Sequence, residues 1–217
     1  MAYHPDKWAK RAREEGYLAR SAYKLLALDR EFHLFSKGDL VLDLGSAPGS
    51  WAQVALEKIG PPPLENKSPI SGRKAQFSKG GGGFVVGVDL EPAKVGNSVN
   101  FAFLRKDIYD ADLESELDKI IRKKFDVVLS DAAPSTTGQK DIDQWRSHEL
   151  ALRVFDIIKD ELKKGGNAVV KVFEGPDTPE VIRLFKESFK RVNMVKPEAS
   201  TKGSKEAYIV AKGFKRE

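Results

Sequence analysis

Cysteine is absent from the 217-residue sequence, and histidine occurs only three times, at His4, His33 and His148. Without cysteine the chain can form no disulfide, no thiolate zinc site and no cysteine nucleophile. Three histidines scattered along the chain do not predict a histidine-rich metal site, so we expect no bound metal.

Long apolar runs are missing as well. No stretch approaches the length of a membrane span, and residues 1–7 form no apolar signal segment. We therefore expect a cytoplasmic protein with no membrane partner. The charge is mildly one-sided, because 37 Lys and Arg residues stand against 32 Asp and Glu residues, a formal net charge of +5. A surplus of this size suits either a polyanionic partner such as nucleic acid or a lysine-rich surface that maintains solubility.

Apolar patterning along the chain predicts an α/β fold. Short apolar runs predict strands at 40–44, 84–89, 101–105, 125–130, 167–173, 191–196 and 206–211. Helical spacing predicts helices at 19–33, 51–59, 114–123, 143–163 and 178–189. This alternation is typical of a parallel sheet with helices on both faces. The length suits one domain over 1–217, with 1–33 as a basic, partly helical extension.

Residues 60–83 break this alternation. Gly60–Pro63 and Gly80–Gly83 bracket a polar segment that contains four basic residues. We expect a long irregular loop, longer than most connections in compact domains. A tolerated surface insertion is the interpretation we favour, and a basic flap that contacts RNA is the alternative.

The stretch Asp43–Trp51 (Asp-Leu-Gly-Ser-Ala-Pro-Gly-Ser-Trp) joins the first predicted strand to a helix. A strand, a glycine turn and a helix in this order form a ligand crevice at the carboxyl end of a parallel strand. Gly45 and Gly49 allow the backbone to approach a ligand where a Cβ atom would collide. The turn therefore predicts a ligand site at this edge of the sheet.

Two acids suggest which ligand binds there. Asp89 ends the second strand, where an acid commonly binds a ribose diol, and Asp107 follows the third strand, where an adenine amino group would lie. Either acid alone suits a loop or a cap, but together after the glycine turn they predict a nucleoside site. The dinucleotide motif G-x-G-x-x-G lacks its middle glycine here, and no G-x-x-x-x-G-K-[ST] loop is present. A cofactor without phosphates fits better, and S-adenosylmethionine is the obvious candidate.

Two charged residues mark the ends of the fourth and fifth predicted strands. Asp131 directly follows strand 125–130, and Lys171 lies among valines in strand 167–173. Adjacent strand ends place both side chains near the crevice. Because a lysine in an apolar strand requires a partner, the pair is either a structural ion pair or part of a reaction site.

At these positions the sequence resembles the FtsJ-like (heat-shock) ribose 2′-O-methyltransferases. The resemblance covers residues 21–210 and rests on the glycine turn and on Arg20-Ser-Ala-Tyr-Lys24-Leu, Ser130-Asp-Ala-Ala-Pro-Ser-Thr-Thr-Gly138, Lys171-Val-Phe-Glu-Gly175 and Lys196-Pro-Glu-Ala-Ser200 with Ser204-Lys-Glu206-Ala-Tyr208. It implies a Rossmann-like class I methyltransferase fold, whose seven-stranded, mostly parallel sheet has an antiparallel seventh strand. It also implies S-adenosylmethionine as methyl donor and a catalytic tetrad of Lys24, Asp131, Lys171 and Glu206.

The resemblance further implies donor-binding residues and an acceptor. Carried over by position, the donor-binding residues are Asp43, Gly45, Ala47, Pro48, Gly49, Trp51, Asp89, Asp107 and Asp131. The implied acceptor is a uridine ribose in large-subunit (23S-type) ribosomal RNA. Since no separate RNA-binding domain is evident, we expect a monomer that acts on the assembled large subunit. The 60–83 segment departs from the bacterial members, in which this connection is shorter.

Two alternatives to this acceptor stay open. A tRNA ribose 2′-O-methyltransferase would use the same site, although Asp131–Gly138 followed by Asp141-Ile-Asp143 is closer to the ribosomal branch. A non-catalytic RNA-binding assembly factor would share the fold but would not need all four tetrad residues.

Basic residues in 7–20 and 196–205 flank the site in sequence. They would form a channel for RNA phosphates if the fold brings them together; otherwise they are ordinary surface charges.

Lys171 has two alternative roles in such a reaction, because a ribose hydroxyl is a poor nucleophile at neutral pH. As a neutral base it would need a pKa lowered by desolvation or by a neighbouring cation such as Lys24. As a cation it would position the hydroxyl and stabilise the developing alkoxide. Asp131 would then orient Lys171, while Glu206 and Lys24 hold the ribose.

Overall fold

The computed structural model describes residues 7–60, 82–96, 98–134, 140–200 and 203–216. Three sequence features fall partly outside these ranges. They are most of the 60–83 segment, the end of the Asp131–Gly138 motif, and Lys202.

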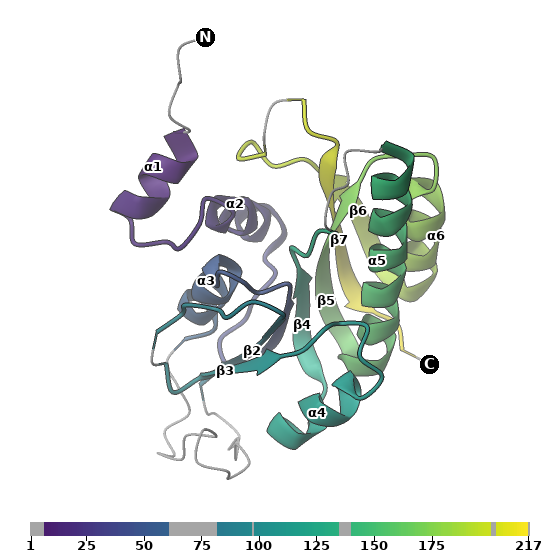
Figure 1. The fold of residues 1–217 in the computed structure, drawn as a ribbon. Helices are drawn as coiled ribbons and strands as arrows, with labels where there is room; N and C mark the ends of the chain where they lie inside the picture. The colour runs from purple at the N-terminus through teal and green to yellow at the C-terminus, as the bar shows by residue number, and fades with distance from the viewer. Residues whose placement is uncertain (1–6, 61–81, 97, 135–139, 201–202, 217) are drawn as a thin grey trace.

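Seven strands form one sheet in the order β3-β2-β1-β4-β5-β7-β6 (Figure 1). Their bounds are β1 Leu40–Leu44, β2 Phe84–Asp89, β3 Phe101–Arg105, β4 Phe125–Ser130, β5 Leu162–Phe173, β6 Phe189–Val195 and β7 Glu206–Phe214. The first five strands pair in parallel, whereas β7 is antiparallel to both β5 and β6. The strand order reverses between β1 and β4, and ligands of open α/β sheets bind outside the carboxyl ends of strands at such a point. The predicted sheet with its antiparallel seventh strand is confirmed.

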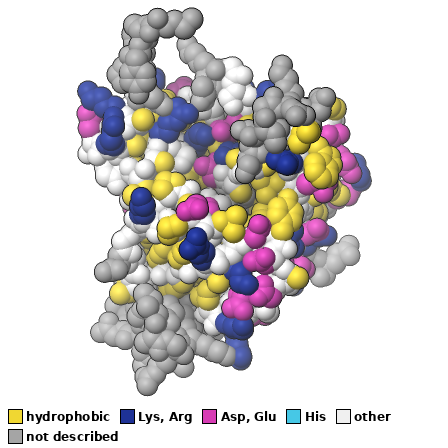
Figure 2. Space-filling view, in the orientation of Figure 1, with side chains coloured by type: hydrophobic (Ala, Val, Ile, Leu, Met, Phe, Trp, Pro, Cys, Tyr) yellow, Lys and Arg dark blue, Asp and Glu magenta, His cyan; other side chains and the backbone are white. Residues whose placement is uncertain are grey.

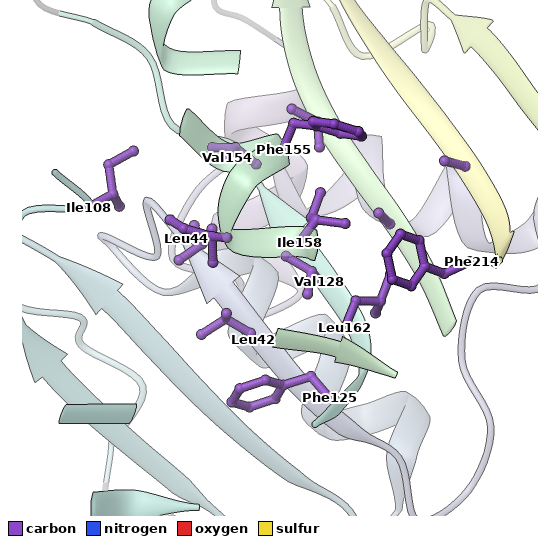
Figure 3. Packing of buried hydrophobic residues seen from close by; sticks show 14 of the residues in the cluster. Leu42, Leu44, Ile108, Phe125, Val128, Val154, Phe155, Ile158, Leu162 and Phe214 are labelled. Carbon is purple, nitrogen blue, oxygen red and sulfur yellow. The ribbon is translucent and has the colours of Figure 1, made fainter. Parts of the chain in front are cut away.

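Helices cover both faces of the sheet (Figure 1). They are α1 Lys7–Glu14, α2 Ala22–Phe32, α3 Ser50–Ile59, α4 Leu113–Ile120, α5 Lys140–Glu161 and α6 Thr178–Ser188. Side chains alternate along each strand, so Leu42 packs with α4, α5 and α6, whereas Val41 packs with α2 and α3. Figure 3 shows the first of these clusters, to which α5 contributes Val154 and Ile158. Within the described ranges, no helix has the length and apolar character of a membrane span.

β7 begins where β5 ends, because the two strands are antiparallel. Phe173 pairs with Glu206, and Lys171 pairs with Tyr208. The start of β7 therefore lies at the same edge of the sheet as the carboxyl ends of the parallel strands. This topology brings Glu206 beside residues that are far away in the sequence.

The boundary between α5 and β5 differs from the prediction. The helix was expected to run to 163 and the strand to begin at 167, but β5 already begins at Leu162. Leu162 is buried and pairs with Phe125, after which the register shifts so that Asn167 pairs with Val127. The intervening Lys-Lys-Gly-Gly forms an irregularity in the strand. Because these four residues are not apolar, the sequence pattern does not indicate that the strand begins before them.

The segment before α2 contains a helix of its own. α1 occupies part of the stretch that the sequence describes only as basic, and α2 begins at 22 rather than at 19. Trp8 packs on Tyr23 of α2, with ring centroids 5.1 Å apart. Ala12 is buried with Ala199 of the 196–205 segment. Figure 2 shows Lys and Arg side chains gathered over α1, so this aromatic contact attaches a basic helix to the domain.

Candidate active site

Four charged side chains, called the tetrad below, meet at the carboxyl edge of the sheet. Lys24 lies on α2, Asp131 follows β4, Lys171 lies near the end of β5 and Glu206 begins β7. Nζ of Lys24 is 2.5 Å from Oε1 of Glu206, and Nζ of Lys171 is 2.9 Å from Oδ1 of Asp131. Each side chain is between 8% and 15% exposed. The four residues that the sequence singled out therefore lie together as two partly shielded ion pairs.

Tyr208 connects the two ion pairs. Its hydroxyl accepts a hydrogen bond from Lys24 at 3.2 Å and lies 2.8 Å from Asp131 Oδ1 and 3.0 Å from Glu206 Oε1. A phenol has one proton to donate, so it serves one carboxylate at a time. Burial raises the pKa of Tyr208, and the charges of Asp131 and Glu206 raise it further, which keeps the phenol neutral.

Tyr208 appears in the sequence only as the end of a motif, and its place in the site was not predicted. The available signal is its spacing from Glu206. Residues i and i+2 of a strand point to the same face of the sheet, so a tyrosine two positions after a site acid belongs beside it.

Glu206 is held as a carboxylate. Burial alone would raise the pKa of Glu206, but the hydrogen bond from Lys24 and the charges of Lys24 and Lys171 outweigh burial and lower it. Ser200 Oγ also lies 3.2 Å from Oε1 of Glu206 and donates to it. Glu206 thus stays a carboxylate at neutral pH.

Lys171 is fixed by Asp131 at two points. Its Nζ atom donates to Oδ1 at 2.9 Å and to the backbone carbonyl oxygen at 2.6 Å. An ammonium group has three N–H donors, and these two contacts within the described chain use two of them. Both partners accept, so Lys171 is arranged as a donor with one N–H left for a bound molecule.

α2 is attached to α3, and this attachment sets the position of Lys24. The Oγ atoms of Ser21 and Ser50 are 2.7 Å apart, and the indole N–H of Trp51 donates to the Ser21 carbonyl at 2.9 Å. The Trp51 ring also packs on Tyr208, with centroids 5.6 Å apart. At 2% exposed, Trp51 supports the tetrad from behind and does not line the neighbouring cavity.

A cavity of about 730 Å³ lies beside the tetrad at the carboxyl ends of β1 to β4. Of the predicted donor-binding residues, it is lined by Gly45, Ala47, Asp89, Asp107 and Asp131. Its volume falls within the roughly 300–1,000 Å³ of small-molecule sites. Because Asp131 both lines the cavity and binds Lys171, a ligand in the cavity would lie next to the tetrad.

Backbone N–H groups orient the two acids of the cavity. Asp89 accepts from the N–H of Ala47 and from the N–H of Glu91, each at 2.9 Å. Asp107 accepts from the N–H of Tyr109 at 3.0 Å. Each carboxylate oxygen has a second lone pair, so both acids can still accept hydrogen bonds from a ligand. Such acids suit hydroxyl and amine donors rather than phosphates.

The glycine turn allows no side chain at two positions. Gly45 has φ +74°, and a Cβ atom there would lie 2.6 Å from Cα of Ala132. Gly49 has φ +115°, and its Cβ would lie 2.5 Å from a methyl carbon of Val95. Gly49 and Pro48 do not line the cavity, so they shape the turn.

Asp43 lies fully buried beneath the turn and does not line the cavity either. Ser46 donates to its Oδ2 at 2.8 Å, whereas Oδ1 has no hydrogen-bond partner among the described residues. Burial raises the pKa of Asp43 to about 7; the Ser46 hydrogen bond opposes this rise, and the charges of Asp131 and Asp89 add to it. Asp43 therefore supports the glycine turn through Ser46 and does not contact a molecule in the cavity directly.

Comparison with known proteins establishes the family of the chain. The sequence model of the FtsJ-like methyltransferases matches residues 17–214. The chain belongs to the FtsJ-like methyltransferase family. This assignment confirms the resemblance seen in the sequence and identifies the protein as a methyltransferase.

Individual relatives agree with the family. The chain is 40% identical to ribosomal RNA large subunit methyltransferase E of Methanothermobacter thermautotrophicus, over 97% of this chain and 90% of the relative. It is 37% identical to the protein of the same name from Borrelia duttonii, over 96% of each. A crystal structure described as a ribosomal RNA methyltransferase from Plasmodium falciparum matches with a TM-score of 0.74 at 28% identity, over 93% of this chain and 100% of that one. The predicted methyltransferase fold is thereby confirmed.

The family implies S-adenosylmethionine as methyl donor for this FtsJ-like chain. The cavity suits that molecule in size, and its acids match the ribose diol and the adenine amine of a nucleoside. Gly45 and Ala47 line the cavity beside these acids, and at Gly45 the turn has no room for a Cβ atom.

Proposed function

We propose that this FtsJ-like enzyme transfers a methyl group from S-adenosylmethionine to the 2′-hydroxyl of a uridine ribose in large-subunit ribosomal RNA. The observation that carries the proposal is the convergence of the tetrad beside the cavity. The names of the two relatives support ribosomal RNA as the acceptor. All four tetrad side chains come from one chain, which supports action as a monomer on the assembled large subunit.

In this proposal the donor lies along the glycine turn. Asp89 accepts from the ribose hydroxyls, Asp107 accepts from the adenine amino group, and the backbone of Gly45 and Ala47 contacts the remainder. S-Adenosylmethionine, when bound, supplies the electrophilic methyl group. The other predicted donor residues act indirectly, by shaping or supporting the turn: Asp43, Pro48, Gly49 and Trp51.

Lys171 acts as a charged donor in the proposed reaction. With two N–H groups bound to Asp131, its third is available to the ribose 2′ oxygen. That hydrogen bond aims the oxygen toward the cavity and stabilises the negative charge that develops as the hydroxyl proton leaves to solvent. The arrangement supports this role over that of a neutral base. Lys24 and Glu206, joined to Asp131 through Tyr208, hold the ribose from the other side.

Transfer of labelled methyl from S-adenosylmethionine to two acceptors tests the proposal. The acceptors are purified large ribosomal subunits and bulk tRNA, both from a strain that lacks this gene. We expect label in large-subunit RNA as 2′-O-methyluridine. Label in tRNA alone would replace the ribosomal acceptor by tRNA. Absence of label in both, together with absence of donor binding, would favour a non-catalytic RNA-binding factor.

A further inference from the structure

An exposed tryptophan lines the cavity and has no part in the site described so far. Trp145 on α5 is 60% exposed, whereas Trp51 is 2% exposed. Large aromatic side chains usually bury most of their surface. An exposed aromatic ring on the wall of a ligand cavity indicates a contact surface rather than a packing element. Figure 2 shows hydrophobic side chains exposed along this side of the molecule.

Helix geometry places Trp145 away from the adenine end of the cavity. Arg153 of α5 donates to the carbonyl of Ile108 at 2.7 Å, which attaches the middle of the helix beside Asp107. Trp145 is eight residues nearer the start of the same helix, and at 1.5 Å per residue this is about 12 Å along the axis. In Figure 1 the amino-terminal end of α5 extends past the carboxyl ends of β4 and β5. Trp145 therefore lies at the outer end of the cavity.

The first turns of α5 also lie beside the reaction end of the sheet. Gln144 and His148 share a small pocket with Phe173, which is two residues beyond Lys171 on β5. Trp145 lines instead the main cavity, together with Asp131. Trp145 and Asp131 therefore border the same space.

We propose that Trp145 is a stacking platform for an unpaired nucleobase of the RNA acceptor, adjacent to the nucleotide whose ribose reaches Lys171. This inference rests on the proposed RNA acceptor. Two molecules meet in the cavity, and the donor's adenine is assigned to the far end, so the flat group that faces Trp145 belongs to the acceptor. Every nucleobase offers a π face, and loss of one base–aromatic stack weakens binding about 10- to 100-fold.

Substitution of Trp145 tests the proposal in the methyl-transfer assay. We expect Trp145→Ala to raise the KM for large ribosomal subunits about 10- to 100-fold, with the Kd for S-adenosylmethionine unchanged, and Trp145→Phe to retain most of the affinity. Val99→Ala is the matched control, because Val99 is 55% exposed and precedes β3 at the opposite edge of the sheet. A weaker donor Kd with unchanged KM for RNA in Trp145→Ala would overturn the proposal and make Trp145 a wall of the donor site.

A binding measurement separates this proposal from the proposed function, because it needs no turnover. Tryptophan fluorescence is titrated with a single-stranded hexaribonucleotide and with the same sequence as a duplex. We expect the single strand to quench the wild type more than Trp145→Phe, and the duplex to do so weakly, since its bases are already stacked. Equal quenching of wild type and Trp145→Phe would refute the platform. Normal quenching in a protein that methylates neither ribosomal RNA nor tRNA would refute the proposed function and leave the platform standing.

Discussion

The two halves of the sheet's carboxyl edge are built in opposite ways. Over β1, β2 and β3 the edge is hollow, and its acids are oriented by backbone N–H groups. β4 ends at the border, where Asp131 lines the cavity, and beyond it, over β5 and β7, the edge is filled by the tetrad, whose side chains bind one another. An acid that is oriented by backbone N–H groups keeps its orientation while ligands bind and dissociate. A network of paired charges keeps donors and acceptors preorganised for a change in charge during a reaction.

This contrast predicts that substitutions in the two halves separate turnover from donor binding. Changes to the tetrad should affect the rate of transfer at saturating donor. Changes to the hollow half should affect the Kd for the donor. A substitution in one half that changed both the transfer rate and the Kd for the donor would contradict this division of the edge.

The largest effect is expected for Lys171→Ala. It removes the donor aimed at the ribose oxygen, so kcat should fall at least about 100-fold while the Kd for S-adenosylmethionine changes little. Steady-state methylation and calorimetry measure the two quantities. Lys171→Arg is the matched variant, because arginine keeps the charge but cannot act as a neutral base. Measurable activity in Lys171→Arg supports the charged role, and normal turnover in Lys171→Ala would remove Lys171 from the reaction.

Asp89→Ala should produce the opposite pattern. Loss of a charged acceptor for the ribose hydroxyls should raise the Kd for S-adenosylmethionine about 10- to 100-fold. At saturating donor, kcat should stay within a few-fold of wild type, because the hydrogen bonds of Asp89 within the described chain run to the backbone of Ala47 and Glu91 and not to the tetrad. Calorimetric titration measures the affinity. A variant with unchanged Kd and a low kcat would contradict the division of the edge.

Tyr208→Phe should have a smaller effect on both rate and stability. It removes the hydroxyl that joins the two ion pairs, so Lys24, Asp131 and Glu206 each lose one hydrogen-bond partner while the ion pairs themselves remain. We expect kcat to fall about tenfold and the free energy of unfolding to fall by about 1–2 kcal/mol. Tyr17→Phe is the control, since the Tyr17 hydroxyl binds Glu57 at the exposed surface. Equal effects of the two substitutions would show that Tyr208 is not a link within the tetrad.

Asp43→Asn should change the pH dependence of stability rather than the rate of transfer or the Kd for the donor. The pKa of Asp43 is raised from 3.8 to about 7, mainly by burial. Its contribution to stability is therefore full below pH 3.8 and is lost as pH rises toward 7, because the unfolded chain ionises first. Relative to wild type, Asp43→Asn should gain up to about 1.4 kcal/mol of unfolding free energy per pH unit across that window. Urea titrations at several pH values measure the difference, and a constant difference would contradict the raised pKa.

Much of the fold could be predicted from the sequence, because buried parallel strands have a strong apolar signal. The first four strands were predicted with the bounds that the structure shows, and β1 is buried at all five positions. The start of β5 was missed, since the signal at Leu162 is one buried residue before a polar irregularity. α1 was missed because its contacts with α2 are long-range and its own sequence is polar.

The candidate site divides in the same way. The charged residues were identifiable from their positions at strand ends and from the family motifs. The link through Tyr208 and the support by Trp51 depend on side-chain geometry across α2, α3 and β7, which no local pattern encodes. The exposure of Trp145 likewise depends on where α5 lies, because the sequence around it is typical of any helix.

In the proposed reaction the tetrad directs a methyl group from the cavity to a ribose 2′ oxygen. The most direct test is nucleoside mass spectrometry of large-subunit RNA after incubation with labelled S-adenosylmethionine and either wild type or Lys171→Ala. We expect labelled 2′-O-methyluridine with wild type and at least about 100-fold less with the variant. Label on a nucleobase, or equal label with both proteins, would contradict it.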